Sequence, residues 1–375
     1  MVTLNSGRQR QWGPTARALQ APQIAQEKQK AMRFNAQIRW ATLLLTFWLA
    51  VAQAGNAQAS AAKRVPSVQA VEAISTTVAD MDRSVGFYAN VLSFRKMSDR
   101  QVALGNAGNG EQVPISRVVS MKLGDESIEL VQYKNAQGRP VPRDSRSNDL
   151  WFQHIAVIVS DLDRAYTVLK VNHVKAASLA PQRLPEWNKN AAGIRAFYFT
   201  DPDGHPLEIL QFPVGKGDAK WHRNSGGLFL GIDHTAIVVS NTEASLRFYR
   251  DVLGMRVAGT SENYGPEQEA LNNVRGAHLR ITTLRAQQGP GIELLEYLEP
   301  RDGRQLPYEP ELSDLLHRQT VVLAHDPARL ANALDSALVV HCHIAEQMGV
   351  TIRDPNGHEL LIRSAAPNTT IGEVK

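Results

Sequence analysis

The chain contains an internal repeat, and a repeat of this length restricts the possible folds more than any other feature of the sequence. The segment VEAISTTVADMDRSVGFYANVLSFRKM, which starts at Val71, recurs as IDHTAIVVSNTEASLRFYRDVLGMRV, which starts at Ile232. Both copies open with alternating apolar residues, which predict a half-buried strand. In the first copy Asp80 is then placed to cap a helix in which Val85 and Tyr88 share one face. Each copy therefore predicts a strand, a turn and a helix in that order.

Two weaker copies complete the repeat. HIAVIVSDLDRAYTVL, from His154, and QTVVLAHDPARLANAL, from Gln319, again place an Asp between a strand and a helix. The second and fourth copies end in similar turns before a final strand, DPDGHPLEIL from Asp201 and DPNGHELLIR from Asp354. The first and third close on the alternating segments ESIELVQY and GIELLEYLEP. The predicted modules span about 69–134, 150–213, 229–298 and 313–366.

The pattern strand–Asp–helix–FYxxVLG, followed by three strands with DPDG before the last, resembles the vicinal oxygen chelate superfamily. That superfamily includes glyoxalase I, extradiol dioxygenases, and bleomycin and fosfomycin resistance proteins. FYRDVLG and DPDGHPLEIL are fairly specific to the fold but not to any one activity. The resemblance covers nearly everything after residue 69. It implies an α+β fold of four βαβββ modules in two paired-module domains with curved mixed sheets, at 69–213 and 229–366.

In this superfamily a divalent metal is held by residues from the first and last strands of paired modules, which gives each module two positions to inspect. The first-strand position lies seven residues before the residue that ends the strand, and through the modules it reads Ala73, His154, His234 and Gln319. The last-strand position reads Glu129, Glu208, Glu293 and Leu361. Glu359 lies two positions out of register, which would keep its face of the strand but change its depth, so it is not counted.

The resemblance to single-chain, four-module glyoxalases implies that modules two and three share one site and modules one and four share another. Modules two and three then supply His154, Glu208, His234 and Glu293, in the ligand order of glyoxalase I. This donor set suits one divalent ion of zinc, nickel, cobalt, manganese or iron. The other pairing has two positions without a donor side chain, so we expect it to be metal-free.

A structural role is the main alternative for each of these residues. A lone histidine in an apolar strand is more often a core residue than a ligand. A glutamate among apolar residues needs a cation or a hydrogen-bond network, and Glu129 keeps this pattern in a module whose histidine position is Ala73. Packing or hydrogen bonding alone can therefore account for such a glutamate.

The remaining histidines and the single cysteine are assigned no metal role. His341, Cys342 and His343 lie together, but their neighbours supply no further pattern of ligands. His205 and His358 each follow a DPxG turn and are interpreted as turn residues outside the ligand positions.

The central site predicts metal-assisted isomerase or lyase chemistry. A Lewis acid that binds two adjacent substrate oxygens stabilises an oxyanion, while Glu208 or Glu293 serves as the base. An iron extradiol dioxygenase is the competing enzyme interpretation, but it normally uses the last two modules, where Gln319 and Leu361 stand. A binding protein that sequesters an aromatic or antibiotic ligand without turnover is the third.

The N-terminus predicts export. Arg33 and Arg39 precede an apolar run over 41–52, and Ala57-Gln58-Ala59 offers the small residues that a signal peptidase accepts. The run is shorter than the roughly 20 residues that cross a bilayer, so we expect cleavage after Ala59, a periplasmic or secreted protein, and no stable membrane span after processing. Residues 1–59 are thus an N-terminal extension and signal peptide.

The resemblance implies a small-molecule substrate as the partner, and the composition does not favour nucleic acid. The formal net charge is +4, but the basic residues are scattered and form no stripe, so no nucleic acid is expected. The single cysteine excludes an intramolecular disulfide.

Overall fold

The computed structural model describes residues 68–102, 116–134, 138–224, 226–306, 308–327, 330, 339–340 and 349–365. The predicted signal peptide and the segment His341–His343 lie outside the described residues. No helix within the described part of the chain has the length and apolar character that a bilayer span requires.

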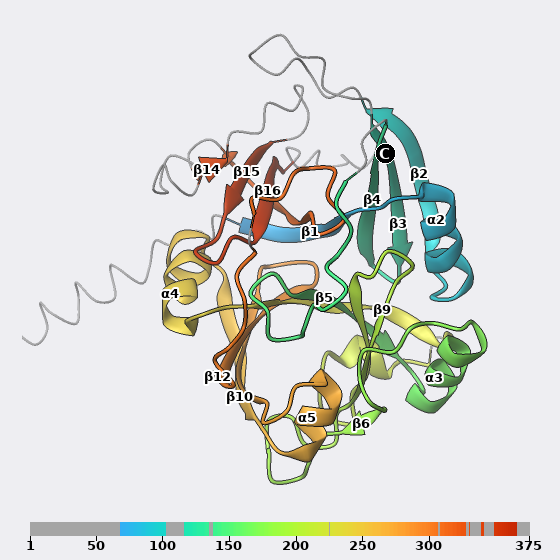
Figure 1. Ribbon diagram of the computed structural model, residues 1–375, viewed down its shortest axis with the longest axis vertical. Helices are drawn as coiled ribbons and strands as arrows, with labels where there is room; N and C mark the ends of the chain where they lie inside the picture. Colours follow the sequence, from blue (N-terminus) through green and yellow to red (C-terminus); the bar gives the residue numbers. More distant parts are fainter. Residues whose placement is uncertain are drawn as a thin grey trace, which may run out of the picture. The chain divides into compact units, whose positions relative to one another are not determined.

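The described residues form two eight-stranded mixed sheets built from the predicted modules (Figure 1). Module one contains β1 (Val68–Thr77), α2 (Met81–Asn90), β2 (Arg95–Val102), β3 (Ser116–Leu123) and β4 (Glu126–Tyr133). Module two contains β5 (Gln153–Val159), α3 (Leu162–Val171), β6 (Gln182–Arg183), β7 (Arg195–Thr200) and β8 (Pro206–Gln211), and the 3₁₀ turn η1 (Ala219–His222) follows it. Module three contains β9 (Phe229–Val238), α4 (Thr242–Leu246), the π-helical turn η2 (Arg247–Val252), β10 (Arg256–Asn263), α5 (Pro266–Asn272), β11 (His278–Arg285) and β12 (Gly291–Glu299). Module four contains β13 (Arg318–Ala324), β14 (Val339–Val340), β15 (Val350–Arg353) and β16 (Glu359–Ser364).

The strand order shows which modules share a sheet. One sheet runs β14-β15-β16-β13-β1-β4-β3-β2 and the other β10-β11-β12-β9-β5-β8-β7-β6. The first strands of modules one and four pair antiparallel, as do those of modules two and three. Within each module the first strand also runs parallel to the last. The α+β fold with curved mixed sheets is therefore confirmed, and modules two and three share a sheet as the resemblance implied.

The first helix of each of modules one, two and three begins where the sequence places a capping side chain. Asp80 accepts a hydrogen bond from the backbone N–H of Arg83 at 3.0 Å, as the sequence predicted, and Asp161 does the same for Arg164. Asn241 caps α4 in the same way. Such a cap contributes about 1 kcal/mol to helix stability.

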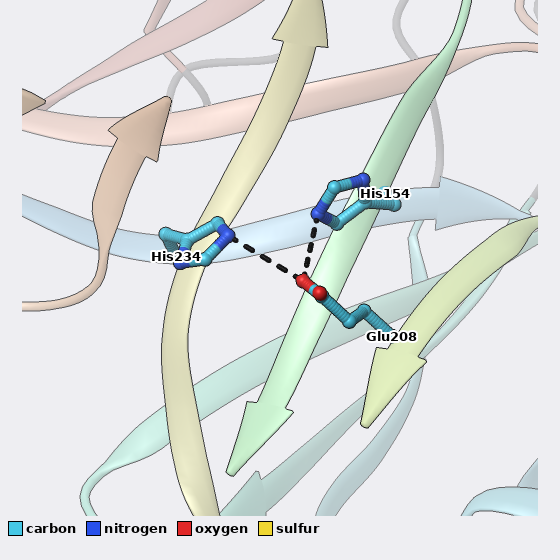
Figure 2. Close-up of side chains that lie close together, drawn as sticks. All are labelled: His154, Glu208 and His234. Carbon is cyan, nitrogen blue, oxygen red and sulfur yellow. Dashed lines mark ion pairs between the residues drawn. The ribbon is translucent and has the colours of Figure 1, made fainter. Parts of the chain in front are cut away.

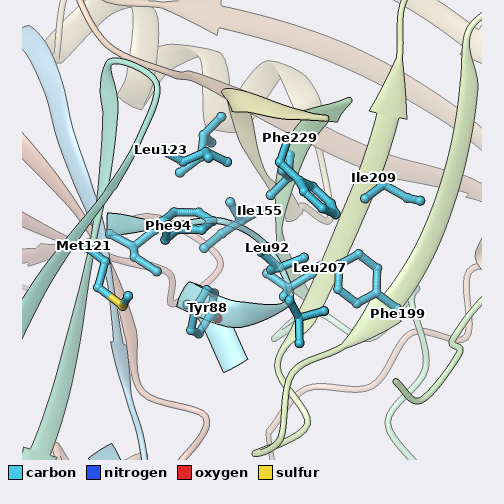
Figure 3. Close-up of a cluster of buried hydrophobic side chains, with 14 of the residues drawn as sticks. Tyr88, Leu92, Phe94, Met121, Leu123, Ile155, Phe199, Leu207, Ile209 and Phe229 are labelled. Atoms are coloured by element: carbon cyan, nitrogen blue, oxygen red, sulfur yellow. The ribbon is translucent and has the colours of Figure 1, made fainter. Parts of the chain in front are cut away.

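The two largest hydrophobic clusters follow the halves of the sequence rather than the sheets. One core joins residues mainly of modules one and two, including Tyr88, Leu92, Phe199 and Leu207 (Figure 3). The other joins residues mainly of modules three and four. A third cluster, which includes Leu271 of α5, joins residues of modules two and three. The helices α2 and α3 thus pack in the core of the first half, while the sheets and the third cluster connect the halves.

The FY and DPxG motifs join successive modules. Tyr88 donates a hydrogen bond to the Asp201 carboxylate at 3.2 Å, and Tyr249 donates to Asp354 at 3.1 Å. The turn histidines extend these links: His205 Nε2 lies 2.6 Å from the carbonyl oxygen of Leu315, and His358 Nε2 lies 2.8 Å from that of Val238. Both histidines lie in turns outside the ligand positions, as expected, and they also connect distant parts of the chain.

Candidate metal centre

Strand register brings the four predicted donors to one sheet face. Glu208 pairs with Ala156 in the parallel ladder of β5 and β8, and Glu293 pairs with Ala236 in that of β9 and β12. Each histidine stands two residues before the alanine of its own strand, so it shares the face of the glutamate one pleat away. The antiparallel pairing of β5 with β9 sets His154 opposite Ala236 and Ala156 opposite His234.

Three of these side chains, His154, Glu208 and His234, meet at the centre of this sheet (Figure 2). His154 Nε2 lies 3.2 Å from Glu208 Oε2, and His234 Nε2 lies 3.7 Å from the same oxygen. Glu293 Oε2 lies 3.3 Å from His234 Nε2. His154, Glu208 and His234 form a compact group whose donor atoms all lie within 4.8 Å of one another. The structure therefore brings together all four predicted residues, with Glu293 beside the compact group.

His154 supplies the test of whether these residues fit a metal ion. Its side chain is buried, yet neither ring nitrogen forms a hydrogen bond, because the contact with Glu208 lacks hydrogen-bond geometry. A buried imidazole without a partner is costly, whereas a neutral imidazole nitrogen is a good ligand for zinc and related ions. Two imidazoles and carboxylate oxygens match the predicted donor chemistry. The triad His154, Glu208 and His234 could thus hold a divalent metal.

Neighbouring polar groups orient the donors. His234 Nδ1 lies 3.0 Å from Asp233 Oδ2, which leaves Nε2 directed toward the glutamates. Arg285 Nη2 donates to both oxygens of Asp233 at 2.8 Å, and Trp221 Nε1 donates to Oδ1 at 3.1 Å. An imidazole fixed through its other nitrogen by a carboxylate is the usual outer support of a metal ligand.

The two histidines differ in their protonation without a metal. Burial lowers the pKa of His154 below its ordinary value, although Glu208 acts in the opposite direction. Burial alone would also lower the pKa of His234, but the charge of Glu293, the hydrogen bond and charge of Asp233, and the charge of Glu208 together raise it to about 9. A cation in the site would therefore take the place of a proton.

The two glutamates differ in exposure and support. The Glu208 side chain is 5% exposed and lies between the two imidazoles. The Glu293 side chain is 18% exposed, and its Oε1 accepts a hydrogen bond from Thr283 at 2.7 Å. The sequence left these residues equivalent, whereas the structure places Glu293 nearer to the space that a substrate would enter.

That space is a cavity of about 460 Å³ between modules two and three. All four donors line it, together with Asp233, Arg285 and Thr283. Apolar side chains form another part of its wall, among them Leu184, Ile194, Tyr198, Phe212 and Leu271. Its size and mixed lining suit a small organic molecule.

The pairing of modules one and four has a different chemistry. In the parallel ladders Ser75 lies opposite Glu129, and Val321 lies opposite Leu361. Ala73 and Gln319 stand two residues before Ser75 and Val321, so they occupy the positions that the histidines hold in modules two and three. Arg363 donates to both oxygens of Glu129 at 3.1 and 2.9 Å, which accounts for a glutamate in this position without a metal.

We expect no more than one tightly bound divalent ion per chain. Ala73 and Leu361 offer no donor, and the Glu129 carboxylate is already neutralised by a guanidinium. Elemental analysis of the purified protein after loading and desalting measures the stoichiometry. Two tightly held ions would show that a second set of donors exists and that this assignment of positions is wrong.

Glu359 belongs to a buried polar cluster one pleat from its module's ligand position. It pairs with Gln319 in the ladder, two residues before Leu361, as its register predicted. Its Oε2 lies 3.0 Å from His317 Nε2 and accepts a bond from the Gln319 amide at 3.0 Å, while Arg353 donates twice to Oε1 at 3.1 Å. Burial alone would raise the pKa of Glu359, but the hydrogen bond and charge of His317, the Gln319 amide and Arg353 outweigh it and lower the pKa to about 2.

This cluster predicts an acid-dependent loss of stability. Because the folded pKa of Glu359 is lower than the ordinary 4.5, its contribution of roughly 3 kcal/mol is fully present above about pH 5 and is lost as the pH falls toward 2. Urea unfolding of the wild type and Glu359→Gln, from pH 7 to pH 2.5, measures the difference. We expect that difference to be constant above pH 5 and to shrink below pH 4.5. A difference that does not change with pH would refute the role of the ionised carboxylate.

Asp233, Arg285 and Thr283 are the site residues that the sequence did not identify. Asp233 directly precedes His234, and this adjacency was the one available signal. Arg285 and Thr283 lie on β11, and only the pairing of β11 with β12 brings them to the site.

Comparisons with known proteins identify the family of the chain. The chain matches the family model described as "Glyoxalase/Bleomycin resistance protein/Dioxygenase superfamily" over residues 70–209 and 231–362. A 2-epi-5-epi-valiolone epimerase from Actinomyces sp is 28% identical over 161 residues, which is 40% of this chain and 84% of that protein.

Solved structures show the same fold. Glyoxalase I from Zea mays aligns with a TM-score of 0.53 at 15% identity, over 79% of this chain and 92% of that one. A putative dioxygenase from Bacillus subtilis subsp. subtilis str. 168 aligns with a TM-score of 0.50 at 13% identity, over 81% and 87%. From its repeated modules, its sheet topology and the match to both halves, the chain belongs to the Glyoxalase/Bleomycin resistance protein/Dioxygenase superfamily.

Proposed function

We propose that the protein is a metal-dependent isomerase or lyase that acts on a small substrate through two adjacent oxygens. The observation that carries this proposal is the compact His154–Glu208–His234 group, with an unpartnered buried imidazole, at the wall of a cavity. The similarity to an epimerase over 40% of this chain supports isomerase chemistry.

The four residues have different roles in the proposed reaction. His154, Glu208 and His234 would hold the ion, with Glu293 completing the donor set. When bound, a divalent cation would supply Lewis acidity that stabilises negative charge on adjacent substrate oxygens. Glu293 is the carboxylate that we assign to proton transfer, because Thr283 fixes its Oε1 and its side chain is the more exposed of the two. The apolar wall excludes water from the substrate carbon that loses its proton.

Solvent exchange tests the proposal without requiring the natural substrate. Protein stripped with a chelator and reloaded with one of zinc, nickel, cobalt, manganese or iron is incubated in D₂O with α-hydroxy ketones and hemithioacetals. We expect one metal to restore replacement of the proton next to the carbonyl by deuterium, followed by NMR. Stoichiometric metal binding with no exchange on any compound would refute isomerase or lyase chemistry.

A ring-cleaving dioxygenase is the second candidate, and the compactness of the two-histidine, one-carboxylate group favours it. That donor set is also used by non-haem iron oxygenases. Oxygen uptake with catechols and Fe(II) separates the two, because the isomerase consumes no oxygen. Binding of an aromatic ligand that survives chelation, without exchange or oxygen uptake, would instead indicate a sequestering protein.

We also propose that the chain is exported and cleaved after Ala59. The basic residues, the apolar run and the small residues at 57–59 support this proposal. Mass spectrometry of protein from the periplasm or medium is expected to find Ser60 at the N-terminus. Recovery of the full-length chain from the cytoplasm alone would contradict it.

A further inference from the structure

We infer that the cavity takes an uncharged hydroxy-carbonyl compound, not a phosphorylated or carboxylated one. This inference rests on the proposed function, since it concerns the substrate of the same site. It follows from the charges and the hydrogen-bonding side chains of the cavity wall.

The first observation is the absence of an available cation among the described residues that line the cavity. Besides the histidines of the metal centre, Arg285 is the basic residue there. Its guanidinium is paired with Asp233: Nη2 donates to both carboxylate oxygens at 2.8 Å, and Nη1 donates to the backbone oxygen at 2.8 Å. Arg285 therefore balances the charge of Asp233 and adds no net positive charge to the wall.

The acidic residues lead to the same conclusion. Glu208, Glu293, Asp233 and Asp218 all line the cavity. A divalent cation would balance the two glutamates, and Arg285 balances Asp233, so the wall retains no positive charge. A phosphate or carboxylate remote from the reacting oxygens would lose its hydration and gain no ionic partner. The conjugate of an α-oxoaldehyde with glutathione, which carries two carboxylates, is disfavoured for this reason.

Neutral hydrogen-bonding side chains form another part of the cavity wall. Asn188 donates to Asn263, Asn263 donates to Gln268, and Gln268 donates to Asn272. Asn272 in turn donates to the hydroxyl of Tyr297 at 2.7 Å. This amide chain fixes the orientation of Asn263 and Gln268, which are buried and line the cavity.

The amide chain leaves hydrogen-bonding capacity for a ligand. Each amide nitrogen carries two N–H groups, and the bonds of the chain use one of them on Asn263 and one on Gln268. The second N–H groups and the oxygen lone pairs can bind hydroxyl groups, which both donate and accept. A hydroxyl can therefore satisfy both the donors and the acceptors of these oriented amides, whereas an ionised phosphate or carboxylate group can satisfy only the donors.

Calorimetry with matched ligands tests the inference. The protein is first loaded with zinc and its metal content measured. Dihydroxyacetone and erythrulose are then compared with their phosphate esters, in which the adjacent oxygens are unchanged and the charge lies at the far end. We expect each neutral compound to bind at least about tenfold more tightly than its ester. Thr260, an exposed residue at the cavity wall, offers a place to add the missing cation.

In Thr260→Lys we expect the esters to bind about five- to tenfold more tightly, while binding of the neutral compounds is unaffected. Thr260→Gln is similar in length but uncharged, and we expect it to change the binding of neither class of compound. If the zinc-loaded protein binds the esters as tightly as the neutral compounds, or binds neither neutral compound, the inference is wrong while the metal centre stands. If the protein takes up no metal at all, the proposed function fails and the inference fails with it.

Discussion

Replacing His234 with alanine is expected to lower metal affinity by at least about 100-fold and turnover by about 1,000-fold, while the protein stays folded. His234 is a donor that contacts both glutamates of the site, at 3.7 and 3.3 Å. Asp233 keeps its bonds from Arg285 and Trp221 in the variant, so no unpaired carboxylate is left behind. The equivalent position in module one is Ala73, which shows that a strand of this kind accepts alanine.

The measurements are metal content, turnover and thermal melting, the last in the presence of chelator so that lost metal does not count as lost stability. Under these conditions we expect a cost of about 1–2 kcal/mol, because the apolar faces of β9 and its neighbours remain buried. His278→Ala is the matched control: this histidine lies on β11 and contacts Glu262 at the surface. Unchanged metal and turnover in His234→Ala would exclude the residue from the site. A much lower melting temperature, in a protein whose wild type never held metal, would support the core-histidine interpretation.

The ligand positions could be predicted from the sequence because strand geometry is periodic. Two residues along a strand return to the same face, so the module alignment alone fixed which positions of β5, β8, β9 and β12 point into the site. The same reasoning excluded Glu359 from the ligand set, and the ladder register agrees. The alignment did not identify the partners of Glu359. His317 lies before β13, and the Arg353 side chain comes from a neighbouring strand.

Contacts between side chains on different strands could not be predicted by aligning the four modules. Glu129 appeared as an unexplained glutamate, and the ion pair that accounts for it comes from Arg363, more than two hundred residues away. Likewise, the difference between Glu208 and Glu293 depends on Thr283, whose position follows from the pairing of β11 with β12. Residues at matching positions of the repeat look alike in the sequence, and only their local contacts show that their roles differ.

The conservative variants Glu208→Gln and Glu293→Gln are therefore expected to fail in different ways. Glu208 lies between both imidazoles and is buried, so its amide variant should lose at least about 100-fold in metal affinity. Glu293→Gln should keep metal affinity within about tenfold, since an amide oxygen remains as a donor, but lose about 100- to 10,000-fold in turnover because it cannot accept a proton.

Deuterium exchange, bound metal and substrate affinity together distinguish a base from a simple metal ligand at Glu293. Glu293→Gln should abolish deuterium exchange at the substrate carbon while leaving bound metal and substrate affinity nearly unchanged, whereas Glu299→Gln, at the exposed end of β12, should alter none of them. Thr283→Val removes the bond that holds Oε1 and should lower turnover about tenfold with the metal retained, which a pure ligand role for Glu293 does not predict. If both glutamine variants instead lose metal equally, the two carboxylates are equivalent donors, and the proton must be moved by another group.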